Sequence, residues 1–351
     1  MLTRQFDFQL PPSRVALRPA EPRDSARLMV VHPQGRIEHR VFRDLGEYLN
    51  LNDILSFNDS RVIPARLSGV RPPRTPEGLE VPVEVTLHKR TGPDRYLAFA
   101  KPARRLQPAD RLDFSPDLRA HVLARNGGEV DLIFEKSGEG LDRAIGRIGA
   151  MPLPPYIASR RAPDVQDLAD YQTIYAAHDG SVAAPTAGLH FTPQMMEKLR
   201  QKGVNLAPLT LHVGAGTFLP VSAEDTRDHA MHAEHAMLDA KTAARLNAAH
   251  AGGGRIAAVG TTALRTLESA TDQSCRIHAF NGDTSIFITP GYHFRAVDML
   301  VTNFHLPRST LFMLVCAFMG LDTMQNAYAE AIREQYRFYS YGDACLLIRP
   351  S

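Results

Sequence analysis

The chain has 351 residues, of which 44% are hydrophobic and 22% charged, and its formal net charge is +2. A chain longer than about 300 residues exceeds what one hydrophobic core usually holds, so we expect two domains, and the ordinary composition argues against long disordered segments. Three widely spaced cysteines, Cys275, Cys316 and Cys345, argue against a disulfide framework or a zinc site and fit a reducing cytoplasm. We expect neither an export signal nor a membrane span, because the longest apolar run, residues 311–321, is shorter than the about 20 residues of a spanning helix.

Residues 67–148 carry the pattern of short antiparallel strands. Hydrophobic and polar residues alternate over residues 80–87, which is the period of a half-buried strand. Residues 121–125 and 130–134 flank an Asn-Gly-Gly sequence at 126–128, which predicts a hairpin. Because prolines punctuate the remainder at close spacing, we expect a small antiparallel β-barrel inserted into another domain.

Residues 1–66 and 149–351 are expected to form that other domain, a discontinuous domain of the mixed α/β (α+β) class. Helix and strand signals alternate along it, and glycines or prolines mark the element ends. The expected elements are a helix capped by Thr192 and ended by Gly203, helices over 239–250 and 262–270 around a strand at 255–259, and two last helices capped by Ser309 and Asp322.

Positive charge is concentrated in residues 61–119, which hold twelve Lys and Arg against seven Asp and Glu. Such a segment is either a solvated basic face or a surface that displaces the counterions of a nucleic-acid backbone. The candidate phosphate-contacting side chains are Arg61, Arg66, Lys101, Arg104 and Arg105.

Three histidines and two carboxylates fall within residues 228–235. Imidazoles are common metal ligands, but the spacing is poor for a metal site. On a helix His229 and His232 share a face that His235 leaves, and on a strand His232 points away from the other two. The segment therefore favours acid/base or polar recognition chemistry over a metal site, and a plain surface position stays open.

Residues 183–191 combine small side chains with a histidine immediately before an expected helix. Thr186, Gly188 and His190 lie in this segment, and small residues let a ligand approach the backbone near a helix start, where negative groups are favoured. The competing interpretation is a tightly packed turn in which His190 satisfies a hydrogen bond of the core.

Residues 211–218 look at first like a dinucleotide-binding loop. His212, Gly214, Gly216 and Thr217 lie here, but the third glycine is missing and Leu-Pro follows in place of a helix. A bulged strand end is therefore the competing interpretation.

Polar groups also follow two expected strands, at 259–265 and 301–307. Strand ends of this kind often bind ligands in α/β folds. Arg265 in the first segment is expected to hold a carboxylate or to form an internal ion pair, and His305 lies in the second. The aromatic residues of 336–341 are expected in the core or stacked on a base.

Together these segments resemble one enzyme family, the S-adenosylmethionine:tRNA ribosyltransferase-isomerases of queuosine biosynthesis. The motifs that carry the resemblance are FNDSRVIPARL (57–67), MPLPPYI (151–157), AAPTAGLHF (183–191), TLHVGAGTF (210–218), DHAMHAE (228–234), VGTT (259–262), TNFHLPRSTL (302–311) and YRFYSYGDA (336–344). The chain departs at His235, where the family has tyrosine, which weakens the metal interpretation further.

The resemblance implies a fold, a reaction and a partner. The family folds as an α/β domain with an inserted β-barrel. It transfers the ribosyl portion of S-adenosylmethionine onto 7-aminomethyl-7-deazaguanine at the wobble position of tRNA, giving epoxyqueuosine with release of adenine and methionine. We accordingly expect a cytoplasmic monomer that acts on tRNA with a GUN anticodon, consumes S-adenosylmethionine, needs no metal or other cofactor and contacts no membrane.

Site roles follow as hypotheses, because removal of a C5′ proton next to the sulfonium requires a base of near-neutral pKa. We expect His190, His212, Asp228 and His229 to carry proton transfer, with His232, Glu234 and His305 as second choices. For the cosubstrate we expect Thr186, Gly188, Gly214, Gly216, Thr217 and Arg265, and for the RNA substrate Arg61, Arg66, Lys101, Arg104, Arg105, Glu234 and His305.

Three other functions stay open at this stage. An S-adenosylmethionine-dependent RNA methyltransferase would release S-adenosylhomocysteine and no adenine, and the chain lacks the glycine-rich first loop of that class. A metal-dependent hydrolase would use the His229 and His232 cluster and respond to chelators. A tRNA-binding chaperone would leave the concentrated histidine segments without a purpose.

Overall fold

A computed structural model describes residues 1–214, 221 and 223–350, and the chain divides into two compact units. The first unit comprises Met1–Ser60, Gln172–His178 and Pro185–Ser351, and the second comprises Arg61–Tyr171 and Asp179–Ala184. The second unit contains all residues of the predicted insert, 67–148, and further residues on both sides of it. The predicted cut points at 66/67 and 148/149 stay a prediction.

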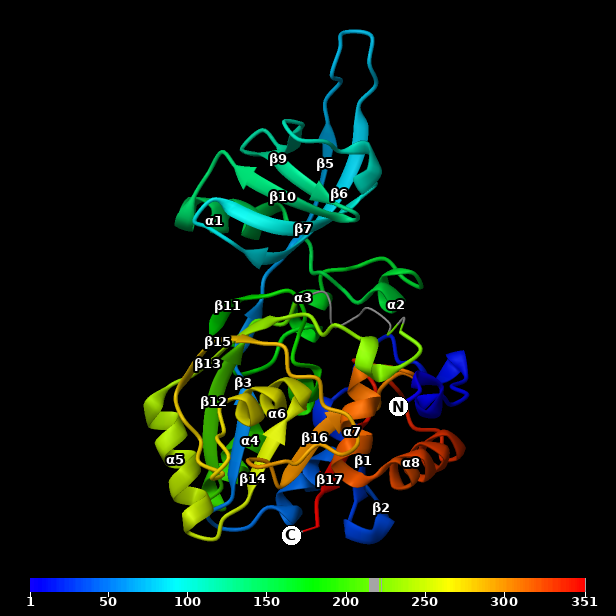
Figure 1. The fold of residues 1–351 in the computed structure, drawn as a ribbon, viewed down its shortest axis with the longest axis vertical. Helices are drawn as coiled ribbons and strands as arrows, with labels where there is room; N and C mark the ends of the chain where they lie inside the picture. The colour runs from blue at the N-terminus through cyan, green and yellow to red at the C-terminus, as the bar shows by residue number, and fades with distance from the viewer. Residues whose placement is uncertain (215–220, 222, 351) are drawn as a thin grey trace. The chain divides into compact units, whose positions relative to one another are not determined.

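The first unit is built on a mixed nine-stranded sheet with the strand order β15-β13-β12-β3-β14-β16-β17-β1-β2 (Figure 1). Its strands are β1 (Arg27–Val31), β2 (Ile37–Val41), β3 (Ile54–Asn58), β12 (Asn205–Leu211), β13 (Glu234–Leu238), β14 (Ile256–Val259), β15 (Phe280–Thr284), β16 (Met299–Asn303) and β17 (Ala344–Ile348). The four central strands β12, β3, β14 and β16 run parallel to one another, and β12 and β16 pair antiparallel with β13 and β17 on their outer sides. Every residue of β3, β14 and β16 is buried, as expected of strands covered on both faces.

Two hydrophobic cores cover the two faces of this sheet. Along β14, Ile256 and Ala258 pack into one core and Ala257 and Val259 into the other, which is the alternation of a strand between two layers. One core is completed by α5 (Ala240–Ala251), α6 (Gly260–Ser269), α7 (Thr310–Met319) and α8 (Leu321–Arg333), and the other by α4 (Pro193–Gln201) and the 3₁₀ helix η5 (Phe42–Tyr48). The α/β class is confirmed.

The helix boundaries follow the predicted capping signals with one exception. Thr192 Oγ1 accepts from Met195 N at 3.3 Å, Ser309 Oγ accepts from Phe312 N at 3.1 Å, and Gly203 has a φ of 83°. Asp322 was predicted as a cap and is not one, because α8 begins at Leu321 after Gly320 and Asp322 lies in its first turn. None of the described helices is long and apolar enough to cross a membrane.

The second unit contains the predicted antiparallel barrel, closed in the order β10-β7-β6-β5-β8-β9. Its strands are β5 (Arg66–Arg71), β6 (Val81–Arg90), β7 (Arg95–Lys101), β8 (Arg111–Ser115), β9 (Leu118–Asn126) and β10 (Glu129–Phe134), followed by α1 (Gly138–Ile148), α2 (Pro155–Ala158) and α3 (Asp167–Asp170). Val81, Val83, Val85 and Leu87 alternate into the barrel interior. Gly127 at a φ of 60° makes the β9–β10 turn, which confirms the hairpin. Elsewhere β4 (Ser60–Val62) pairs with β11 (His178–Ser181).

Candidate active site

The central parallel strands end at one edge of the sheet, and four of the predicted site residues, His212, Gly214, Arg265 and His305, follow these ends. Asp59 follows β3, His212 follows β12, α6 follows β14, and Asn303 closes β16. From β3 the chain continues to β12 on one side, whereas from β14 it continues to β16 on the other. Open α/β sheets bind ligands in the crevice outside such a reversal, at the carboxyl ends of the strands.

Thr186, Asn303 and His190 form a chain of side-chain hydrogen bonds at this edge. Thr186 and His190 belong to the 3₁₀ helix η7 (Thr186–His190), and Asn303 is the last residue of β16. Thr186 Oγ1 donates to Asn303 Oδ1 at 2.8 Å, and Asn303 Nδ2 lies 3.2 Å from His190 Nε2. Since the Asn303 oxygen is used by Thr186, its amide N–H is the group that meets His190, and Nε2 accepts.

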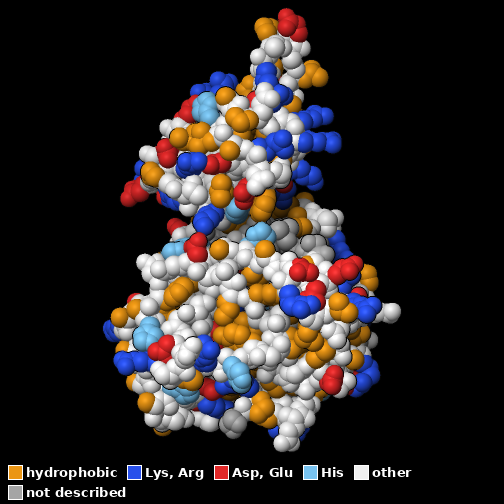
Figure 2. Space-filling model, viewed as in Figure 1, with side chains coloured by type: hydrophobic (Ala, Val, Ile, Leu, Met, Phe, Trp, Pro, Cys, Tyr) orange, Lys and Arg blue, Asp and Glu red, His pale blue; other side chains and the backbone are white. Residues whose placement is uncertain are grey.

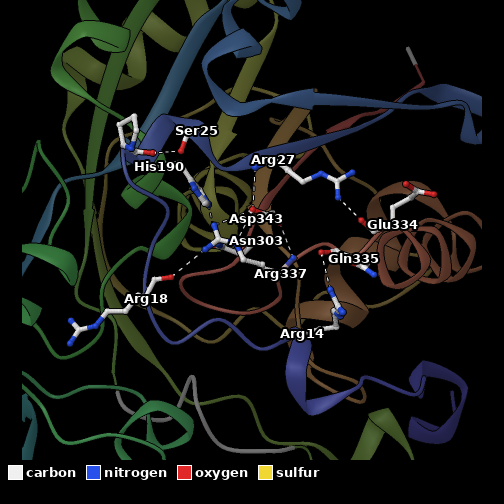
Figure 3. Close-up of polar contacts among 11 residues, drawn as sticks. Arg14, Arg18, Ser25, Arg27, His190, Asn303, Glu334, Gln335, Arg337 and Asp343 are labelled. Carbon is white, nitrogen blue, oxygen red and sulfur yellow. Dashed lines mark hydrogen bonds and ion pairs between the residues drawn. The ribbon is translucent and has the colours of Figure 1, made fainter.

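His190 is a buried, neutral side chain in this network. Its exposed fraction is 5%, and its ring lies 4.8 Å from the Phe42 ring centroid. Burial lowers the pKa of His190 to about 3, and the positive charges of Arg337 and Arg23 contribute in the same direction. Figure 3 shows Arg337 close by, where Asp343 Oδ1 accepts from its Nε and Nη2 at 3.3 and 3.2 Å.

His305 is held in the same neutral state. Its Nε2 lies 2.9 Å from Thr302 Oγ1, and its backbone N–H donates to the Tyr328 hydroxyl at 3.0 Å. Burial alone lowers the pKa of His305 to about 3. With 5% of its surface exposed, His305 has little surface for a substrate.

His212 differs from His190 and His305 in its hydrogen bonding. Its side chain is half-buried, and its Nδ1 is buried without a hydrogen-bond partner among the residues that the structure describes. Burial, with smaller contributions from His235 and His178, lowers the pKa of His212 below its usual value. His212 is therefore neutral at physiological pH and keeps an unused ring nitrogen.

A buried carboxylate lies near His212. Asp59 Oδ1 accepts from Thr210 Oγ1 at 2.7 Å, and Asp59 Oδ2 lies 3.6 Å from His178 Nε2. Burial raises the pKa of Asp59, and the Thr210 hydroxyl and His178 oppose that shift. His178 acts on both groups, because it lowers the pKa of Asp59 and also that of His212.

Asp228, His229 and His232 lie in a more open segment. Asp228 ends the 3₁₀ helix η9 (Thr226–Asp228) and is exposed, as is His232. His229 is half-buried with its ring 5.1 Å from Phe287, and burial followed by His232 lowers its pKa. Among the described residues no three His, Cys, Asp or Glu side chains converge as a metal site.

Glu234 and Arg265 form a buried ion pair. Glu234 begins β13 and Arg265 lies on α6, and their side chains are 5% and 4% exposed. Glu234 Oε1 also accepts from Gly214 N at 3.2 Å, and Arg265 Nε donates to Ile286 O at 3.2 Å. Of the two roles expected for Arg265, the internal ion pair is present, while Nη2 is buried and has no acceptor in the described part of the chain.

The small residues expected at the cosubstrate differ in what surrounds them. A Cβ at residue 188 would lie 2.1 Å from the Tyr175 hydroxyl oxygen, so packing against Tyr175 already requires Gly188. A Cβ at Gly214 would meet nothing within 4 Å among the residues that the structure describes. Gly216 and Thr217 lie outside the described residues.

The cationic candidates for the RNA substrate belong to the second unit, and the histidines belong to the first. Arg61 Nε lies 3.2 Å from Asp179 Oδ1, and Arg66 on β5 pairs with Glu84 on the neighbouring strand β6. Lys101, Arg104 and Arg105 are exposed.

Several residues of the site were not singled out by the sequence patterns. Asn58 fixes the end of β12 through two hydrogen bonds, its Nδ2 donating to Leu211 O at 2.9 Å and its Oδ1 accepting from Leu211 N at 3.0 Å. Asp59 and Asn303 likewise follow strand ends, which is the only local signal that could have found them. Arg337 and Asp343 lay in an aromatic segment, where no periodicity marks a polar pair.

Comparisons with known proteins agree with this architecture. A family model described as a queuosine biosynthesis protein matches residues 3–347. Proteins called S-adenosylmethionine:tRNA ribosyltransferase-isomerase are similar over nearly the whole chain: 58% identical in Rhodopseudomonas palustris (strain TIE-1), covering 99% of each chain, and 57% in Phenylobacterium zucineum (strain HLK1), covering 99% of this chain and 100% of the relative. The crystal structure of S-adenosylmethionine tRNA ribosyltransferase from Thermotoga maritima aligns with a TM-score of 0.56 at 37% identity, covering 98% of this chain and 100% of that one.

Proposed function

The chain belongs to the family of queuosine biosynthesis proteins, and on this premise we propose that it is an S-adenosylmethionine:tRNA ribosyltransferase-isomerase. The reaction moves the ribosyl group of S-adenosylmethionine onto 7-aminomethyl-7-deazaguanine at the tRNA wobble position and rearranges it to the epoxycyclopentanediol of epoxyqueuosine. Adenine and methionine leave.

The observation that supports the catalytic assignment best is the state of His212. The sulfonium acidifies the neighbouring C5′ hydrogens, and a base must be neutral and have a free lone pair to remove one. His212 has a lowered pKa, follows β12 at the carboxyl edge of the parallel strands and keeps a ring nitrogen unused by the described residues. We propose that His212 removes the C5′ proton. Asp59 and His178 are then the groups that accept this proton from His212.

His190 has another role in this scheme. Its Nε2 is occupied by the Asn303 amide, so that lone pair is not available to a substrate proton. A neutral imidazole held in one tautomer acts as a hydrogen-bond donor through its other nitrogen and fixes the position of η7 against β16. Asp228 and His229, in the more open segment, are the remaining candidates for protonating adenine and deprotonating the incoming amine.

For the cosubstrate we propose the backbone of Gly188, Gly214 and Gly216, the hydroxyls of Thr186 and Thr217, and the unused Nη2 of Arg265. Glu234 then acts mainly by holding Arg265 and the Gly214 amide, and His305 acts from behind through Thr302. S-adenosylmethionine is consumed, and we propose that no metal or further cofactor takes part.

For the RNA we propose a tRNA with a GUN anticodon, contacted through its phosphates by Arg61, Arg66, Lys101, Arg104 and Arg105. Base modification requires the wobble nucleotide to leave its stack. We further propose that the enzyme is cytoplasmic and monomeric. Sedimentation of the purified protein tests the monomeric state.

One assay tests the function. Protein is incubated with S-adenosylmethionine and an anticodon stem-loop that carries the deazaguanine precursor, and adenine and the RNA mass are measured. The proposal requires adenine and an RNA adduct that both depend on the two substrates and persist with a chelator. S-adenosylhomocysteine with a methylated RNA would establish the methyltransferase instead, and chelator-sensitive hydrolysis would establish the metal enzyme.

A further inference from the structure

One bidentate ion pair latches the β5–β6 hairpin of the barrel to the connection between β7 and β8. Arg74 follows β5, and Asp110 directly precedes β8. Arg74 Nε donates to Asp110 Oδ1 at 2.7 Å, and Arg74 Nη2 donates to Asp110 Oδ2 at 2.6 Å. The Asp110 side chain is 5% exposed and that of Arg74 41%. Two parallel hydrogen bonds to a buried carboxylate fix orientation as well as distance.

The same latch holds the backbone of the β7–β8 connection. Arg74 Nη2 also donates to the carbonyl of Arg105 at 3.0 Å, and Asp110 Oδ2 accepts from Gln107 N at 2.9 Å. These bonds lie on either side of the end of the 3₁₀ helix η6 (Ala103–Arg105). The turn is therefore tied at two points to one residue pair.

The connection between β7 and β8 carries positive side chains that no acidic side chain of the described residues pairs with. Several other barrel arginines meet carboxylates, as in the pairs Arg66–Glu84, Arg90–Asp142, Arg95–Asp131 and Arg111–Asp113. Within the described chain Lys101, Arg104 and Arg105 are exposed and have no acidic partner. Figure 2 shows Lys and Arg side chains gathered along one edge of the barrel unit.

We propose that Lys101, Arg104 and Arg105 form a preorganised surface for RNA phosphates, and that Arg74 and Asp110 are positioning residues that hold it in place. This inference rests on the proposed function, because it takes tRNA as the partner. Fixing the turn before binding removes part of the ordering cost that flexible cationic loops pay when they meet a polyanion.

Asp110→Asn separates this proposal from simple charge attraction. The substitution removes a negative charge next to the surface, so attraction alone predicts tighter RNA binding. If position matters, tRNA transcript affinity falls by about fivefold, because Arg74 loses its bidentate partner and the turn is released. Asp117→Asn is the matched control, since it removes one charge from an exposed barrel carboxylate, and its affinity should be unchanged or slightly higher.

The full set of variants is measured by RNA titration at several salt concentrations, with circular dichroism as the folding check. Arg104→Ala with Arg105→Ala should weaken binding and reduce the salt slope by about 1 per lost phosphate contact. Arg74→Met should lower RNA affinity as much as Asp110→Asn does. The variant that carries both substitutions should lose no more affinity than either single variant. Wild-type affinity in a folded Asp110→Asn protein overturns the positioning role, and wild-type affinity in the Arg104/Arg105 variant overturns the surface. Adenine release by the wild-type enzyme, measured separately, decides the proposed function.

Discussion

His190 and His212 follow the same sheet edge and are both neutral, yet their surroundings differ. The Nε2 of His190 accepts a hydrogen bond from the Asn303 amide, and the Asn303 oxygen accepts one from the Thr186 hydroxyl. His212 is half-buried with an Nδ1 that meets no partner in the described structure. In the proposed scheme His190, whose Nε2 is held by Asn303, positions its neighbours, whereas His212, whose Nδ1 is left unpartnered, exchanges a proton with the substrate. The following predictions test this difference, from the largest expected effect to the smallest.

His212→Ala should lower kcat by about 10²- to 10⁴-fold, because a general base is lost. The rate of adenine release at saturating substrate concentrations measures kcat. His278→Gln is the control, since His278 is an exposed histidine of the same unit paired with Asp272, and it should keep wild-type turnover. Full activity in a folded His212→Ala protein would remove His212 from the scheme and return the role to Asp228 or His229.

Arg265→Met should destabilise the fold by about 3–5 kcal/mol, because it leaves the buried Glu234 carboxylate without its cation. Urea unfolding measures the loss. Arg227→Met, which breaks an exposed pair with Asp225, should cost at most about 1 kcal/mol. Adding Glu234→Leu to Arg265→Met should recover much of the stability but not the activity, since the Gly214 amide beyond His212 also loses its acceptor.

Asn303→Asp should lower kcat by about 10- to 100-fold through the ionisation state of His190. A carboxylate against Nε2 favours the imidazolium, so the pKa of His190 rises from about 3. ¹⁵N NMR of the imidazole reports both tautomer and charge: the wild type should carry its proton on Nδ1, and the variant should titrate at higher pH. A wild-type His190 protonated on Nε2 would contradict the hydrogen-bond chain.

His305 provides a test through stability alone. Its pKa is about 3 in the folded protein and near 6.5 when unfolded, so below about pH 6.5 the unfolded state binds a proton that the folded state does not. The free energy of unfolding therefore falls as the pH drops towards about 3, by about 1.4 kcal/mol per pH unit from this residue. His305→Gln should show a shallower decline between about pH 6 and about pH 4; an identical slope would mean that His305 is charged in the native state.

Much of the fold was predictable because its signals are local. Thr192, Ser309 and Gly203 act within one helical turn, and the Gly127 turn lies between the two strands that it joins. Asp322 shows the limit, because Gly320 starts α8 two residues earlier and the acidic residue enters the first turn instead. The candidate histidines and Arg265 were visible for the same reason, as side chains next to strand ends.

The sequence by itself determined several helix ends, the class of the fold and the family, since capping, periodicity and motifs are read from neighbouring residues. Only the tertiary structure decided that the Nε2 of His190 is hydrogen-bonded, because Thr186 and Asn303 are 117 residues apart and His190 and Asn303 are 113 apart. It also decided that Arg265 meets Glu234 and that Asp59 meets Thr210. Burial and hydrogen bonding set the charge of each of these groups, and both arise only when distant strand ends meet at one edge of a sheet.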